Sequence, residues 1–88
     1  MQIKSDFTIQ KVGNSYVAVA VGKTSKTFHS MIKLNETGAF LWNKLAERDM
    51  TEEELIEALL GEYDVDRETA ERDVHTIVEN LAAHGILQ

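Results

Sequence analysis

The stretch LNETGAFLWNKL, Leu34–Leu45, marks the point at which the hydrophobic pattern of the chain changes. Upstream of it, apolar residues alternate or cluster in short runs, as they do in β-strands. Downstream they recur every three or four residues, as they do in helices. A chain with its strands first and its helices afterwards is typical of an α+β domain, in which helices pack on one side of a small antiparallel sheet. The sequence therefore predicts an α+β fold.

The composition is that of one folded domain. The chain has 88 residues, of which 43% are apolar and 27% charged, so we expect a single domain over residues 1–88. It contains no cysteine, which excludes a disulfide framework and thiolate sites. The N-terminus lacks a secretory signal, and no apolar run approaches the roughly 18 residues that span a bilayer. We therefore expect a soluble cytoplasmic protein that has no membrane partner.

The net charge of −6 is unevenly divided along the chain. Residues 1–44 hold six lysines and two acids, whereas residues 45–88 hold three arginines and 13 acids. The predicted sheet is therefore mildly basic and the predicted helices are strongly acidic. An acidic helical surface repels the phosphate backbone, so we expect no nucleic-acid partner.

Three strands are predicted in the first half of the chain. Phe7–Val12 and Tyr16–Val21 have strand-like sequences and flank Gly13-Asn14, which predicts a hairpin whose turn type stays open. Thr27–Leu34 is predicted as the third strand, because its apolar residues alternate. One face of that strand would carry Phe28, Ser30 and Ile32, and the other His29, Met31 and Lys33.

Three helices are predicted in the second half, each opened by a capping residue. Asn35 is expected to cap the first, Thr51 to cap the second in a capping box with Glu54, and Asp66 to cap the third. Gly61 and Gly85 are expected to end the second and third helices. The predicted buried stripes are Ala39, Phe40, Trp42, Leu45 and Ala46; Leu55, Ile56, Leu59 and Leu60; and Ala70, Val74, Ile77, Val78 and Leu81.

Two residues of the first predicted helix have alternative interpretations. Trp42 belongs either to the core or to the edge of a peptide-binding groove, where aromatic anchors are common. Gly38 weakens the helix, so it either allows close approach to a neighbouring element or marks a fraying end.

The sequence contains no catalytic or metal-binding pattern. His75 and Glu79 are four residues apart on one helix, a spacing that could give two metal ligands but is more typical of a solvent-facing helical pair. Ser30 and His29 are neighbours on a strand and point to opposite faces, so they cannot form a nucleophile–base pair. No glycine spacing matches a phosphate-binding loop. We therefore expect no enzymatic activity, no catalytic residue, no metal and no cofactor.

The third predicted strand is the best candidate for a functional surface. Lys26 and Lys33 place positive charge on it, and Phe28, Met31 and Ile32 offer apolar contacts. Lysines on an edge strand commonly prevent aggregation between edges. Alternatively, the edge pairs with a peptide whose acidic residues meet the lysines.

The segment that joins strands to helices carries a resemblance to a known family. Leu34-Asn35-Glu36-Thr37-Gly38 followed by Phe40-Leu41-Trp42 resembles the LN-x-TG-x-x-[IL]W signature of the PqqD-like family. The segments 51–66 and 70–87 agree with that family in order and spacing. The likeness covers roughly residues 7 to 87.

This resemblance implies a RiPP recognition element, a winged-helix-like domain of three strands and three helices. Such domains bind the leader segment of a ribosomally made precursor peptide and present it to a modifying enzyme, often a radical SAM protein. In the family, the leader adds to the third strand as a further strand, and its side chains enter a cleft beside the third helix. Carried onto this chain, the resemblance implies that the leader contacts Lys26, Thr27, Phe28, His29, Ser30, Met31, Ile32 and Lys33 in the strand, and Val74, His75, Val78 and Leu81 in the helix.

Two other possibilities stay open beside this one. The runner-up is a winged-helix DNA-binding regulator, which the acidic helices disfavour. Pairing of third strands between two copies would give a homodimer, so we expect a monomer or a weak homodimer. The strand sequences differ from those of the PqqD proteins of pyrroloquinoline quinone synthesis, so the peptide product also stays open.

Overall fold

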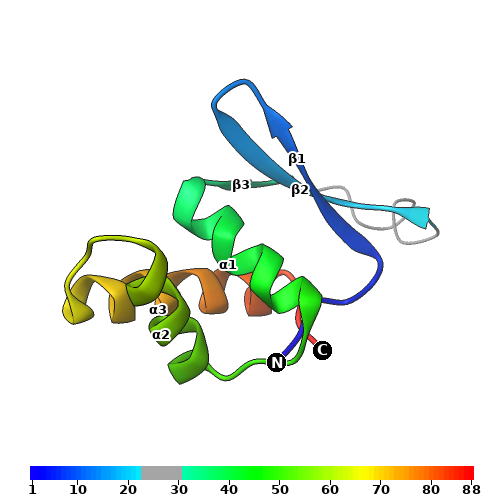
Figure 1. The fold of residues 1–88 in the computed structure, drawn as a ribbon. Helices are drawn as coiled ribbons and strands as arrows, with labels where there is room; N and C mark the ends of the chain where they lie inside the picture. The colour runs from blue at the N-terminus through cyan, green and yellow to red at the C-terminus, as the bar shows by residue number, and fades with distance from the viewer. Residues whose placement is uncertain (23–30) are drawn as a thin grey trace.

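The computed structural model of the chain describes residues 1–22 and 31–88 (Figure 1). The elements follow the order β1 (Phe7–Val12), β2 (Ser15–Ala20), β3 (Ile32–Leu34), α1 (Glu36–Glu47), α2 (Glu52–Glu62) and α3 (Arg67–Ala83). The predicted α+β fold, with antiparallel strands first and helices afterwards, is confirmed. In the third predicted strand, residues 27–30 lie outside the described part, and Met31 stands just before β3.

The sheet has the strand order β1-β2-β3, and both pairings are antiparallel. In the β1–β2 hairpin, Val12 pairs with Ser15, so Gly13 and Asn14 form a two-residue loop. Gly13 has φ +62° and Asn14 does not have positive φ. This combination fits the type II′ turn, which requires glycine at its first central position and matches the twist of the strands.

All three helices lie on one side of the sheet, and the core fills the space between them (Figure 1). In α1 the buried residues Gly38, Leu41, Trp42 and Leu45 follow the helical spacing of three and four. Trp42 is only 2% exposed, which confirms that it belongs to the core. The predicted stripe was wrong at Ala46, which is exposed, because the buried face is centred on Leu41 and Leu45 instead.

The helix starts are capped as the sequence predicts. Asn35 accepts a hydrogen bond from the Gly38 N–H (2.8 Å), and Asp66 accepts one from the Thr69 N–H (3.0 Å). Thr51 and Glu54 form the complete capping box of α2. These side chains pair backbone N–H groups that the helices themselves leave without a partner.

The predicted helix ends are confirmed at Gly85 and wrong at Gly61. Gly85 follows α3 and has φ +70°, a conformation that favours glycine. Gly61 lies inside α2, which continues to Glu62 and is capped by Tyr63 in an extended conformation. Tyr63 packs edge-on against Phe40, with 5.5 Å between the ring centroids, so the helix ends where this ring reaches the core.

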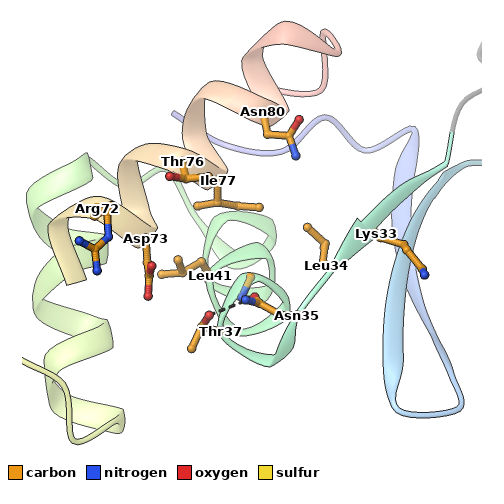
Figure 2. Close-up of a pocket in the computed structure, with 11 residues that line it drawn as sticks. Lys33, Leu34, Asn35, Thr37, Leu41, Arg72, Asp73, Thr76, Ile77 and Asn80 are labelled. Atoms are coloured by element: carbon orange, nitrogen blue, oxygen red, sulfur yellow. Dashed lines mark hydrogen bonds between the residues drawn. The ribbon is translucent and has the colours of Figure 1, made fainter. Parts of the chain in front are cut away.

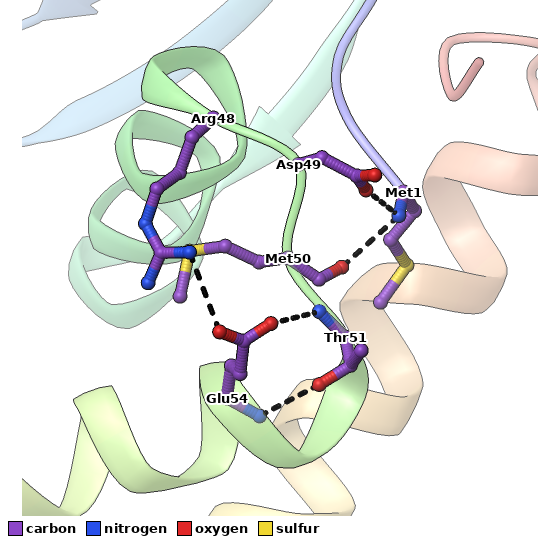
Figure 3. Close-up of polar contacts among 6 residues, drawn as sticks. All are labelled: Met1, Arg48, Asp49, Met50, Thr51 and Glu54. Atoms are coloured by element: carbon purple, nitrogen blue, oxygen red, sulfur yellow. Dashed lines mark hydrogen bonds and ion pairs between the residues drawn. The ribbon is translucent and has the colours of Figure 1, made fainter.

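Polar contacts connect the end of α1 to the start of α2 (Figure 3). The N-terminal ammonium group of Met1 pairs with the Asp49 carboxylate and donates to the Met50 carbonyl oxygen at 3.1 Å. Glu54 accepts from the Thr51 N–H (3.0 Å) and pairs with Arg48 (3.3 Å). Both interactions favour the ionised carboxylate and lower the pKa of Glu54, the backbone hydrogen bond from Thr51 contributing most.

The two ends of the described chain lie side by side (Figure 1). Ile3 and Leu87 form an isolated antiparallel bridge, and Ile3 and Ile86 are buried in the core. The residues after Gly85 therefore fold back onto the core. No helix in the described residues is long and apolar enough to cross a membrane.

Candidate functional site

A cavity of about 320 Å³ lies where β3, the first turns of α1 and the middle of α3 meet (Figure 2). Its lining comprises Lys33, Leu34, Asn35, Thr37, Gly38, Leu41, Arg72, Asp73, Thr76, Ile77 and Asn80. The cavity combines the end of a strand with a face of a helix. A second hollow, of about 450 Å³, lies between α1 and α2 and is bordered by helix residues and their flanks, several of them glutamates.

The cavity combines an apolar base with polar walls. Leu34, Leu41 and Ile77 come from three different elements and are at most 7% exposed. Thr76 and Asn80 are exposed residues of α3 that border the same space. Such a site can accept an apolar side chain at its base and hydrogen-bonding groups along its walls.

The position of α1 against β3 depends on Gly38. A Cβ atom at Gly38 would lie 3.1 Å from Asn35 Oδ1 and 3.5 Å from the Leu34 side chain. Asn35 Oδ1 accepts hydrogen bonds from both the Gly38 N–H and the Thr37 hydroxyl, the latter at 3.0 Å. The interpretation that Gly38 allows close approach is therefore confirmed, and the segment from Leu34 to Gly38 fixes one wall of the cavity.

Two cationic residues, Lys33 of β3 and Arg72 of α3, line the cavity. Lys33 is exposed on β3, and in Figure 2 its side chain points away from α3. Arg72 forms no ion pair with any described residue, whereas Arg48 pairs with Glu54 and Arg67 pairs with Glu53, Glu57 and Glu71. Arg72 lines the cavity, and its charge also acts on the Asp66 carboxylate, whose pKa is lowered by hydrogen bonds with Thr69 and, in addition, by this charge.

The edge of β3 beside this cavity is open in the described part of the chain. β3 pairs with β2 through Tyr16–Leu34, Val17–Lys33 and Ala18–Ile32. No other described strand pairs with β3, so its second edge is available to an added strand.

The residues predicted for the strand side of the site divide into two groups. Lys26, Thr27, Phe28, His29 and Ser30 lie outside the described residues. Of the others, Ile32 is 4% exposed and belongs to the core, while Met31 is 72% exposed. Lys33 is the one described residue of this predicted set that lines the cavity.

The residues predicted for the helix side lie on other faces of α3. Val74 and Leu81 are completely buried in the core, and Val78 is half-buried against it. His75 is exposed, with Nε2 3.2 Å from Glu79 and Nδ1 3.6 Å from Glu52, so it is the solvent-facing partner that its spacing indicated. None of these four residues lines the cavity.

The prediction from the sequence did not include the face of α3 that lines the cavity, because that face is mostly polar. The apolar stripe of α3 packs into the core, and the cavity meets the adjacent face of the same helix. That face carries Arg72, Thr76 and Asn80 at four-residue intervals, with Asp73 and Ile77 beside them. A polar row next to an apolar stripe was the signal in the sequence, but only the position of β3 distinguishes it from an ordinary solvated face.

The described residues contain no group of three His, Asp or Glu side chains placed to hold a metal ion. Within the same residues, no buried polar side-chain atom lacks a hydrogen-bond partner. The cavity therefore offers surface for binding, and its described residues provide no assembled metal centre.

Two comparisons with known proteins give matches, one to a protein family and one to solved structures. The model of the family described as coenzyme PQQ synthesis protein D (PqqD) matches residues 16–87. Among solved structures, TbiB1 in complex with the TbiA(beta) leader peptide is similar with a TM-score of 0.73 and 27% sequence identity, over 100% of this chain and 95% of that one. No curated protein matches the chain.

A second solved structure has the same fold. It is lasso peptide synthetase B1 complexed with the leader peptide, with a TM-score of 0.69 and 22% identity, over 97% of this chain and 93% of that one. Both similarities extend over almost the whole of each chain, so they concern the complete arrangement of three strands and three helices.

Proposed function

The chain belongs to the family of coenzyme PQQ synthesis protein D, and from this membership we propose that it is a non-catalytic adaptor that binds the leader segment of a ribosomally synthesised precursor peptide. The observation that carries the proposal is the similarity to TbiB1, whose solved structure is a complex with a leader peptide. The open edge of β3 beside a partly apolar cavity supplies a site of the kind that an extended peptide needs.

In the proposed complex, the leader adds to β3 as a further strand. Backbone hydrogen bonds to β3 set the register, and alternate side chains of the leader face the cavity. The base formed by Leu34, Leu41 and Ile77 takes an apolar side chain. Lys33, together with the lysines that precede it in the sequence, favours leaders that carry Asp or Glu.

The adaptor presents the core of the precursor to a separate modifying enzyme, such as a radical SAM protein, in the cytoplasm where the precursor is made. The peptide-contacting residues proposed from the sequence, from Lys26 to Lys33, are retained as the strand side of this interaction. On α3 the proposal now centres on the residues that line the cavity.

The test uses the short open reading frames that neighbour the gene for this chain. Synthetic peptides that cover the N-terminal half of each encoded product, labelled with a fluorophore, are titrated with the chain and followed by fluorescence anisotropy. We expect one of them to bind, and the variant Lys33→Glu to bind an acidic leader about 5- to 10-fold more weakly because of charge repulsion.

The matched control is Lys11→Glu, which makes the same change in β1 at the other side of the sheet. Lys11 is exposed, and its Nζ atom lies 6.0 Å from the centroid of the Tyr16 ring. It stands on β1, which β2 separates from β3. This variant should keep the wild-type affinity. Equal losses in the two variants, or no binding of any neighbouring peptide to the wild-type chain, would contradict the proposal.

A further inference from the structure

We propose that α3 holds the leader by its backbone, with Thr76 and Asn80 hydrogen-bonding the edge of the added strand that faces away from β3. This inference rests on the proposed function and deepens it. It assigns to the polar face of α3 a recognition task that does not depend on the leader sequence.

The need for such contacts follows from the two edges of a β-strand. Pairing with β3 satisfies the N–H and C=O groups along one edge of the leader only. In the proposed complex, the groups along the other edge face α3, and the helix takes the place of part of the water around them. An unpaired backbone group that is removed from water weakens binding, so partners on α3 would add affinity.

Thr76 and Asn80 are placed to be those partners. Both side chains border the cavity, and Figure 2 shows Asn80 pointing towards β3, with Thr76 one turn earlier on α3. Within the described residues, neither side chain has a hydrogen-bond partner of its own, so both polar groups are available to a ligand. A hydroxyl and an amide can each donate and accept, which matches the alternation of N–H and C=O groups along a strand.

The spacing of the two residues fits the repeat of a strand. Four residues of α-helix rise about 6.0 Å, whereas one edge of a strand repeats every two residues, or about 6.7 Å. Side-chain rotation covers a difference of this size. In Figures 1 and 2 the chain directions of α3 and β3 are roughly opposite, so a strand added at the open edge of β3 can lie along the helix.

Arg72 extends the same row by one further turn. It lines the cavity and has no ion-pair partner among the described residues. A guanidinium group only donates hydrogen bonds, so at this end of the row it suits a leader carbonyl or carboxylate oxygen. Arg67 differs from Arg72 in this respect, because its guanidinium group forms ion pairs with three glutamates.

The first experiment compares α3 variants by anisotropy with the leader peptide that binds the wild-type chain. Asn80→Leu and Thr76→Val remove the polar groups and keep the size of the side chains. Each should weaken binding about 5- to 10-fold. The matched control Asn43→Leu lies on the exposed surface of α1, outside the cavity, and should not change the affinity.

The second experiment distinguishes backbone recognition from side-chain recognition. Each backbone amide of the leader is replaced in turn by an ester, which removes the N–H donor and leaves the side chain unchanged. If the leader pairs with β3 alone, only every second ester should weaken binding, because alternate N–H groups of a strand point to opposite edges. With α3 as a second partner, the intervening esters near the cavity also weaken binding, and this additional loss disappears in Asn80→Leu or Thr76→Val.

The outcomes separate this inference from the proposed function. A wild-type chain that binds no leader would overturn both. Binding in which every second ester is silent, or in which Asn80→Leu and Thr76→Val match the Asn43→Leu control, would overturn the role of α3 and leave leader binding by β3 intact. Circular dichroism of each variant confirms that the comparison is made between folded chains.

Discussion

Four of the five residues from Leu34 to Gly38 have separate structural tasks. Leu34 ends β3 and forms part of the cavity base, Asn35 caps α1, and Gly38 lets the helix approach the strand. The Thr37 hydroxyl donates to the same oxygen of Asn35 that caps the helix. These contacts fix the angle between strand and helix, so this segment determines the shape of the site while neighbouring residues supply most of its surface.

The two glycines at helix ends should respond in opposite ways to the same substitution. Gly61 lies inside α2, and no atom lies within 4 Å of the position that a Cβ would take. Gly61→Ala should therefore raise the free energy of unfolding by about 0.5–1 kcal/mol, because alanine loses less backbone entropy in a helix. Gly85 has φ +70°, so Gly85→Ala should lower it by about 1–2 kcal/mol.

Urea unfolding followed by circular dichroism measures both changes. Both positions are open to solvent, so the contrast between them isolates backbone conformation from packing. Stabilisation by both substitutions, or destabilisation by both, would contradict the assignment of Gly61 to the helix interior.

The caps of the helices give the chain a predictable response to acid. Asp66 accepts hydrogen bonds from the side chain and the backbone N–H of Thr69, and these lower its pKa below the usual value. A group whose pKa is lower in the folded chain stabilises the fold when it is ionised. That stabilisation is present above about pH 4 and is lost as the pH falls through the folded pKa.

The variant Asp66→Asn should therefore lose less stability than the wild type between pH 7 and pH 3. Asparagine also caps helices but does not ionise. Urea unfolding at the two pH values gives the comparison, and Asp64→Asn, in the same connection between α2 and α3 but outside the cap, is the control. An equal loss in wild type and Asp66→Asn would show that this carboxylate does not contribute to the acid response.

The elements themselves were largely predictable from the sequence because the signals for them are local. Asn35, Thr51 and Asp66 each pair with an N–H group three residues further along, so the helix starts could be inferred from neighbouring residues alone. The end of α2 could not, since it depends on where Tyr63 meets Phe40 in the folded chain. The cavity face of α3 likewise depends on the placement of β3, which no local pattern encodes.

The charge of the whole molecule disfavours binding to nucleic acid, and so disfavours the winged-helix regulator. The chain has a net charge of −6, and 13 of its 15 acids lie in the half that forms most of the helical surface. We expect no change in anisotropy when a labelled DNA duplex is titrated with the chain at about 0.15 M salt, because the acidic helices repel the phosphates.

Binding of the labelled leader peptide under the same conditions is the positive control for an active sample. Salt-dependent binding of the duplex in the micromolar range would contradict this view. A decrease in affinity with increasing salt would then indicate phosphate contacts, which the helices as described do not offer.

The single tryptophan of the chain gives it a built-in optical signal. Trp42 is 2% exposed and lies in the core on the α1 face, away from water. Its fluorescence emission should be at short wavelength in the folded chain and move to long wavelength when the core opens to solvent. The intrinsic emission therefore reports unfolding without any dye, whereas occupancy of the cavity has to be read from a fluorophore on the peptide.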